Sequence, residues 1–297
     1  MRVAAIQTTS VPDCERNLSE AGGLVREAAE AGAELVVLPE YFSVAGNPTF
    51  LRRHAERLDG PTITWASELA RECAIHLVAG SVPERTDGTD GPEGRLFNTS
   101  CLIEPGGTVT AVYRKVHLFD VGLEGLSFRE SDTVAPGDRV CVAPLGAMTG
   151  PGRPDSPVLG LSICYDLRFP EPYRIMALLG ATVMAVPAAF TAATGPHHWE
   201  LLLRARAVEN QVYVIGAGQV GDLPPGMPPG HGHSMIVDPW GTVVAERIDP
   251  SPGVVLADLD AVEQHRIRSE LPVLAHRRAE AYRWPDDNSG GTIGSNG

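Results

Sequence analysis

Three side chains that could do chemistry each follow an apolar, strand-like run. Glu40 comes after "LVVLP", Lys115 after "TAVYR" and Cys164 after "LGLSI". Strand ends in α/β proteins hold catalytic groups rigidly at the edge of a cleft. Taken singly, each has an ordinary explanation, because a glutamate after a strand is usually a solvated turn residue and a lone cysteine is usually a small buried hydrophobe.

The basic residues are distributed unevenly between two types. Of the 24 lysine and arginine residues, 23 are arginine and one, Lys115, is lysine. This bias suggests that Lys115 occupies a position that needs a compact, adjustable ammonium and at which a guanidinium does not serve. The alternative is the chance survival of one surface lysine.

Amide hydrolysis through a thioester would use all three residues. Cys164 would attack as a thiolate, with its pKa lowered by the Lys115 ammonium. The same ammonium and the backbone N–H of Tyr165 would stabilise the oxyanion of the tetrahedral intermediate. Glu40 would accept the thiol proton, protonate the departing nitrogen and later activate the hydrolytic water. This chemistry needs no metal and no cofactor.

Four segments together resemble the nitrilase superfamily of carbon-nitrogen hydrolases, whose members use a Glu-Lys-Cys triad. The segments are "VVLPEYF", "YRKVHLFD", "ICYDLRFPE" and "HHWELLLRARAVENQVYV", and the resemblance covers residues 1–283. It implies that Glu40 is the general base and acid, Lys115 the oxyanion-stabilising cation and Cys164 the nucleophile. It also implies an αββα sandwich that forms a homodimer, in which the sheets stack into four layers.

The resemblance further implies a second glutamate in the active site, between the lysine and the cysteine. "FRES" places it at Glu130, where it would fix the lysine and orient the substrate amide. Glu124, in "GLEG", lies close by and is the alternative.

Within the superfamily, "GHSMIVDPWG" and "TGPHHWELLLRARAVENQ" look most like the branch that contains omega-amidase and deaminated-glutathione amidase. That branch implies a small, acyclic, carboxyl-containing amide as substrate, with release of ammonia or an amine. Arg168, four residues after the cysteine, could bind the substrate carboxylate, although a structural salt bridge is an equally good explanation. A nitrilase or an N-carbamoyl amino acid amidohydrolase would use the same triad, and both remain open.

Strand-like and helical runs alternate along the chain and predict an α/β fold. Strands are expected at "RVAAIQ", "ELVVLP", "IHLVAG", "SPVLGLSIC", "ATVMAVP" and "VYVIGAG". Helices are expected near residues 15–31, 49–58, 62–73 and 171–179 and over "HHWELLLRARAVENQ". Two hairpins are expected, one joining "LFNTSCLIEP" to "TVTAVYRKVHL" and one within "GHSMIVDPWGTVVAE".

No linker or internal repeat divides the chain, so we expect one domain over residues 1–284. The loop 145–157 is dense in glycine and proline and is expected to be exposed. Residues 285–297 are polar and rich in small residues, which is typical of a disordered tail.

Two other patterns suggest different functions. Gly216, Gly218 and Gly221 match the G-x-G-x-x-G motif of dinucleotide-binding oxidoreductases, but the proline-rich "DLPPGMPPGHGHS" that follows excludes the helix that this motif requires. The histidines at 197–198 and 231–233 have no acidic or cysteine partner at a metal-site spacing, so we expect no metal.

The composition limits the partners and the compartment. A net charge of −13, spread along the chain, argues against nucleic acid as a partner. The five scattered cysteines form no CxxC pair, which favours a reducing, cytoplasmic setting over a disulfide framework. There is no secretory leader pattern and no apolar run long enough to span a membrane. We therefore expect a cytoplasmic enzyme of a small molecule, without a membrane partner.

Overall fold

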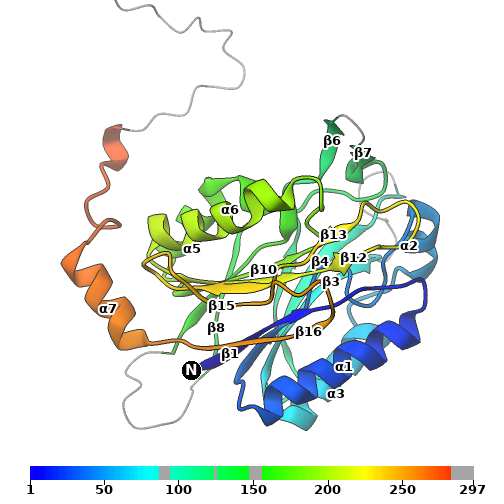
Figure 1. Cartoon of the computed structure of the whole chain (residues 1–297), viewed down its shortest axis with the longest axis horizontal. Coiled ribbons are helices and arrows are strands. Elements are labelled where there is room, and N and C mark those ends of the chain that lie inside the picture. The colour runs from blue at the N-terminus through cyan, green and yellow to red at the C-terminus, as the bar shows by residue number, and fades with distance from the viewer. Residues whose placement is uncertain (87–93, 124–125, 147–155, 282–297) are drawn as a thin grey trace, which may run out of the picture.

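The computed structural model of the chain describes residues 1–86, 94–123, 126–146 and 156–281 (Figure 1). The expected tail at 285–297, most of the expected loop at 145–157 and the alternative residue Glu124 lie outside the described residues.

One six-stranded sheet is built mainly from the first half of the chain. Its order is β16 (Gly253–Asp258), β1 (Arg2–Gln7), β2 (Leu35–Val37), β3 (His76–Glu84), β4 (Phe97–Ile103) and β5 (Val109–Arg114). The strands β1, β2 and β3 are parallel, and β4 and β5 continue antiparallel as the expected hairpin. Helices α1 (Cys14–Glu30) and α3 (Pro61–Cys73) lie on its outer face (Figure 1).

The second six-stranded sheet follows the same plan. Its order is β15 (Val243–Glu246), β14 (Met235–Val237), β11 (Tyr213–Gly218), β10 (Val183–Ala188), β9 (Val158–Leu161) and β8 (Cys141–Pro144). The strands β9, β10 and β11 are parallel at its centre. Helices α5 (Pro170–Leu178) and α6 (Gly195–Asn210) cover its outer face (Figure 1).

The alternation of side chains along the strands creates the layers. In β1, Val3 and Ala5 belong to a core shared with the second sheet, whereas Ala4 and Ile6 belong to the core beneath α1 and α3. Both faces of a central strand are therefore buried, which explains its continuous apolar sequence. Helix, sheet, sheet and helix layers result, and the predicted αββα sandwich is confirmed.

Shorter elements complete the described chain. They are α2 (Pro48–His54), β6 (Asp120–Leu123), β7 (Leu126–Arg129), β12 (Val220–Gly221), β13 (Gly230–His231), α7 (Ala261–Glu270) and the 3₁₀ helices η1 (Glu130–Asp132), η2 (Cys164–Arg168) and η3 (Ala279–Ala281). No helix within the described ranges has the length and apolar character to span a membrane.

Two local outcomes bear on the sequence predictions. The helix expected near 49–58 ends at His54, because Ala55 is extended and the N–H of Glu56 donates to the carbonyl of Pro83 in β3. After Gly218, the chain enters the short strand β12 and not a helix, so the G-x-G-x-x-G pattern lacks its dinucleotide-binding context.

Candidate active site

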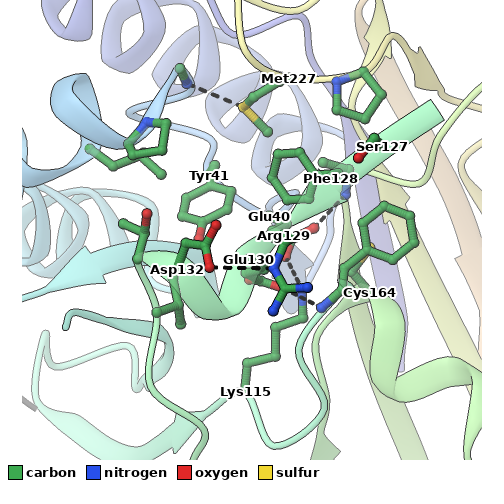
Figure 2. A pocket seen from close by; sticks show the side chains of 18 residues that line it. Glu40, Tyr41, Lys115, Ser127, Phe128, Arg129, Glu130, Asp132, Cys164 and Met227 are labelled. Carbon is green, nitrogen blue, oxygen red and sulfur yellow. Dashed lines mark hydrogen bonds and ion pairs between the residues drawn. The ribbon is translucent and has the colours of Figure 1, made fainter. Parts of the chain in front are cut away.

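A cavity of about 240 Å³ brings together four of the predicted residues. Glu40, Lys115, Glu130 and Cys164 all line it (Figure 2). They come from both sheets, since Glu40 follows β2 and Lys115 follows β5, whereas Cys164 follows β9. The sandwich therefore assembles the site across its layers.

The centre of the site is one ammonium shared by two carboxylates. Lys115 Nζ donates to Glu40 Oε1 and to Glu130 Oε2, each at 2.8 Å, and all three side chains are buried. Burial by itself lowers the pKa of Lys115, but Glu130 and Glu40 outweigh it and raise the pKa well above its usual value. The lysine is therefore a permanent cation.

Asn98 bridges the same two carboxylates from β4. Its Nδ2 donates to Glu40 Oε1 at 2.8 Å and to Glu130 Oε1 at 3.1 Å. The sequence analysis missed this residue. A signal was present, because Asn98 is a polar residue inside an otherwise strand-like run, but only the register of β4 beside Lys115 gives it a role.

Glu40 is held by a further strand end that the sequence analysis missed. The backbone N–H of Ala189, directly after β10, donates to Glu40 Oε2 at 2.8 Å. Gln219 Nε2 donates to the Glu40 carbonyl at 3.0 Å, and Tyr41 adopts the left-handed φ of 53°. These contacts orient the carboxylate toward Cys164.

Cys164 begins η2 with a left-handed φ of 47° and is 8% exposed. The sequence analysis expected Lys115 to lower the pKa of this thiol; Lys115 acts in that direction, but the net shift is the opposite. Burial and the neighbouring Glu40 carboxylate raise the pKa well above the usual value, and the opposing effect of Lys115 is smaller. With two carboxylates already sharing the ammonium, the resting cysteine is a thiol.

The second glutamate of the site is Glu130, the first residue of η1. Its Oε2 accepts the backbone N–H of Phe119 at 2.7 Å in addition to the lysine. This bond ties the carboxylate to the chain that follows β5 and fixes it beside Lys115.

Cys164 also lines a second, smaller cavity of about 20 Å³. Tyr165, Arg168, Ala189 and Phe190 contribute to its lining. The guanidinium of Arg168 lies 5.1 Å from the centroid of the Phe190 ring and 5.7 Å from that of Tyr165.

The polar partners of Arg168 are neutral groups. Its Nη2 donates to Thr194 Oγ1 at 3.3 Å, and Nη1 lies 3.2 Å from His198 Nδ1, which is placed to accept. Within the described chain it forms no ion pair, so the alternative of a structural salt bridge is not what the structure shows.

The histidines single out no metal centre. His198 lies beside Arg168, and His233 lies 2.6 Å from Glu246 Oε2. Over the residues that the structure describes, no three His, Cys, Asp or Glu side chains are grouped closely enough to hold a metal ion.

Known proteins share both the sequence pattern and the fold. Residues 2–268 match the family described as carbon-nitrogen hydrolase. Deaminated glutathione amidase of Bos taurus is 42% identical over 282 residues, which cover 94% of this chain and 83% of that protein. Omega-amidase NIT2 of Homo sapiens is 38% identical over 284 residues, which cover 95% and 96%.

A solved structure agrees with these relatives. Nit3 of Saccharomyces cerevisiae, a member of branch 10 of the nitrilase superfamily, has a TM-score of 0.80 to this chain at 33% identity. The match covers 92% of this chain and 94% of that one.

Proposed function

Because the chain belongs to the carbon-nitrogen hydrolase family, we propose that it hydrolyses a small, carboxyl-bearing linear amide through a thioester on Cys164. One observation carries the proposal: a buried ammonium shared by two carboxylates lines the same cavity as a cysteine in a strained turn. The curated relatives that are named as amidases favour an amide over the other bonds that this family hydrolyses.

Acylation begins with the transfer of a proton from Cys164 to Glu40. The thiol is protonated in the free site because its pKa is raised, so it needs a general base as it attacks. Glu40 Oε1 already accepts from Lys115 and Asn98, whereas among the described contacts Oε2 accepts only from Ala189. The second lone pair of Oε2 is therefore the one that takes the proton.

The sulfur then forms a bond to the amide carbon, and the carbonyl electron pair moves to oxygen. Lys115 and the backbone N–H of Tyr165 stabilise this oxyanion. When the intermediate collapses, the C–N bond breaks and Glu40 returns its proton to the nitrogen, which leaves as ammonia or an amine.

Deacylation uses Glu40 a second time. It is ionised again after acylation, so it accepts a proton from the water that attacks the thioester. The C–S bond breaks, the carboxylic acid product leaves, and the Cys164 sulfur takes back the proton. Glu130 and Asn98 hold Lys115 and Glu40 in place throughout.

Arg168 is the residue proposed to bind a carboxylate on the substrate. It is a cation without an ionic partner in the described chain, and it lines the same small cavity as the nucleophile. Its planar guanidinium can hold a carboxylate through two parallel hydrogen bonds. A carboxylate there would replace weak neutral contacts with charged ones.

The proposed enzyme works as a cytoplasmic homodimer. Large apolar side chains are exposed on α5, directly after it and on α6, on the outer face of the second sheet; they include Ile175, Leu178, Leu179 and Leu201. Pairing two copies through these helices would remove them from water. The five free cysteines fit a reducing compartment.

The test is product release by the purified chain over omega-amides of oxo acids, deaminated glutathione, carbamoyl amino acids and nitriles. We expect ammonia or amine release from a carboxyl-bearing amide, and a covalent acyl adduct on the Cys164 peptide by mass spectrometry after acid quenching. Cys164→Ala should abolish both signals. Turnover of a nitrile or a carbamoyl compound alone, or turnover that survives Cys164→Ala, would reject the proposal.

A further inference from the structure

Asp166 connects the segment that carries Lys115 to the turn that carries Cys164. We propose that this aspartate is a positioning residue, which sets the distance between the lysine ammonium and the cysteine sulfur. The proposal rests on the function proposed above, because it assigns Asp166 a part in that reaction without contact with the substrate.

The carboxylate of Asp166 is fully buried and accepts four hydrogen bonds. Its Oδ2 accepts the hydroxyl of Tyr113 at 2.7 Å and the backbone N–H of Ile163 at 2.9 Å. Its Oδ1 accepts the backbone N–H of His117 at 2.9 Å and lies 2.8 Å from His117 Nδ1. Asp166 itself lies in η2.

These partners lie on both sides of the two reacting residues. Tyr113 and His117 are the second residues before and after Lys115, so the lysine lies at the centre of the segment that Asp166 holds. Ile163 directly precedes Cys164, and Asp166 is the second residue after it. A single side chain therefore fixes both segments relative to one another.

Ring packing reinforces the same connection. The imidazole of His117 stacks on Phe169, with centroids 3.7 Å apart and planes 10° apart. Phe169 directly follows η2, so the lysine segment contacts the turn both at Asp166 and at its C-terminal end.

The turn needs this support because Cys164 has a left-handed backbone. A non-glycine residue at φ 47° is strained and persists only where its surroundings over-determine it. The N–H of Ile163 donates to the Asp166 side chain, and the N–H of Asp166 donates to the carbonyl of Ile163 at 3.0 Å. This reciprocal pair closes the turn around the cysteine.

Asparagine cannot replace this aspartate. A backbone N–H points at each carboxylate oxygen, from His117 at Oδ1 and from Ile163 at Oδ2. Whichever way the amide of Asp166→Asn is turned, its NH₂ faces one of these donors and leaves it without an acceptor. The variant keeps the size of the side chain but loses the hydrogen bond either to the lysine segment or to the cysteine turn.

The test measures the rate at which iodoacetamide alkylates Cys164 in the full chain, because this reaction needs no amide substrate. Asp166→Asn should slow alkylation roughly 30-fold, since a displacement of about 1 Å can cost up to 100-fold. In a Lys115→Met background, the same change should slow it less than about 3-fold, because the ammonium that Asp166 positions is gone. A merely structural role would give equal effects in both backgrounds.

Two buried tyrosines provide a matched pair if Asp166→Asn does not fold. Tyr113→Phe removes one bond to Asp166 from the lysine side. Tyr173→Phe removes a bond of 2.8 Å to Ser162, which lies on the cysteine side alone. We expect Tyr113→Phe to slow alkylation about 5-fold and Tyr173→Phe to change it less than about 2-fold, as single neutral hydrogen bonds allow.

Three outcomes would overturn the proposal: faster alkylation in Asp166→Asn, equal effects with and without Lys115, or equal effects of the two tyrosine variants. Turnover gives a further readout, in which kcat falls and KM changes little. If no amide is hydrolysed, the proposed function fails, and the alkylation rates still show whether Asp166 couples the two segments.

Discussion

Residues 114 and 115 are neighbours in the chain, yet they belong to two ion clusters of opposite character. Arg114 binds one carboxylate through two bonds, from Nε and Nη2 to the two oxygens of Glu84 at 2.8 and 2.5 Å. Its guanidinium lies 4.3 Å from the centroid of the Phe97 ring and is partly exposed. Lys115 instead offers one nitrogen to Glu40 and Glu130 and is completely enclosed.

The difference shows what distinguishes a structural cation from a reactive one. Arg114 and Glu84 match one another in charge and in geometry, so their pair is complete. The Lys115 cluster has one more carboxylate than ammonium, and burial together with the Glu40 carboxylate keeps Cys164 protonated until Glu40 takes the proton. The two ion clusters share no residue, so each can be changed without removing a contact of the other.

Exchanging the two cations should have the largest effect. Lys115→Arg keeps the charge but lacks the size and the hydrogen-bond geometry of the ammonium, so we expect kcat to fall about 1000-fold. Arg114→Lys should keep kcat within about 3-fold and lower the free energy of unfolding by about 1 kcal/mol. Steady-state kinetics and urea unfolding measure the two effects. Similar kinetics in both variants would erase the distinction between the clusters.

Neutralising one carboxylate in each cluster should have the next largest effect. Glu130→Gln leaves Lys115 with a single anionic partner and presents an amide to it, so kcat should fall about 100-fold. Glu84→Gln should leave kcat within about 2-fold while costing about 2 kcal/mol of unfolding free energy, because it removes the buried anion of a half-exposed ion pair. A loss of activity in Glu84→Gln, measured on folded protein, would contradict this separation.

Adding a carboxylate should shift the pH dependence of the reaction. Asn98→Asp places a third carboxylate around one ammonium. The repulsion among the three carboxylates raises their apparent pKa, so the acidic limb of the kcat/KM profile should move to a higher pH by about one pH unit. Thr99→Val changes the adjacent residue, which donates to Glu84 Oε2 at 2.6 Å, and should leave the profile in place. An unshifted profile in Asn98→Asp would show that Asn98 does not act on the carboxylates.

The smallest effect concerns Cys101, which lies on β4 two residues after Thr99. Burial and then Glu84 raise the pKa of this thiol to about 12. Between an ordinary pKa near 9 and this value, the unfolded chain loses the proton and the folded chain keeps it, so stability falls as pH rises. At pH 10, this loss of unfolding free energy is about 1 kcal/mol, and Cys101→Ala should abolish it. If the unfolding free energies of the wild type and Cys101→Ala changed in parallel above pH 9, this prediction would be refuted.

The sequence predicted what depends on local pattern. Periodicity and turn residues gave the strands and helices, and the three strand ends led to Glu40, Lys115 and Cys164. The family resemblance supplied Glu130, which the structure places against Lys115.

The features of the site that the sequence did not predict depend on strand register and on contacts between distant segments. Asn98 and Ala189 meet Glu40 only because β4 and β10 lie where they do, and no local signal states this. The net shift of the Cys164 pKa could not be predicted for the same reason, since the sequence shows one nearby lysine but neither the burial of the thiol nor the Glu40 carboxylate beside it.

Because the site is assembled from both sheets, the enzyme can be active only after both have folded. A nascent chain that ends before β8 has the base and the cation but no nucleophile, and the segment from β8 onward has a thiol without either. Two fragments of this protein, cut before β8 and mixed, would regain turnover only when β16 of the second fragment pairs with β1 of the first, which makes the fold a basis for a split reporter.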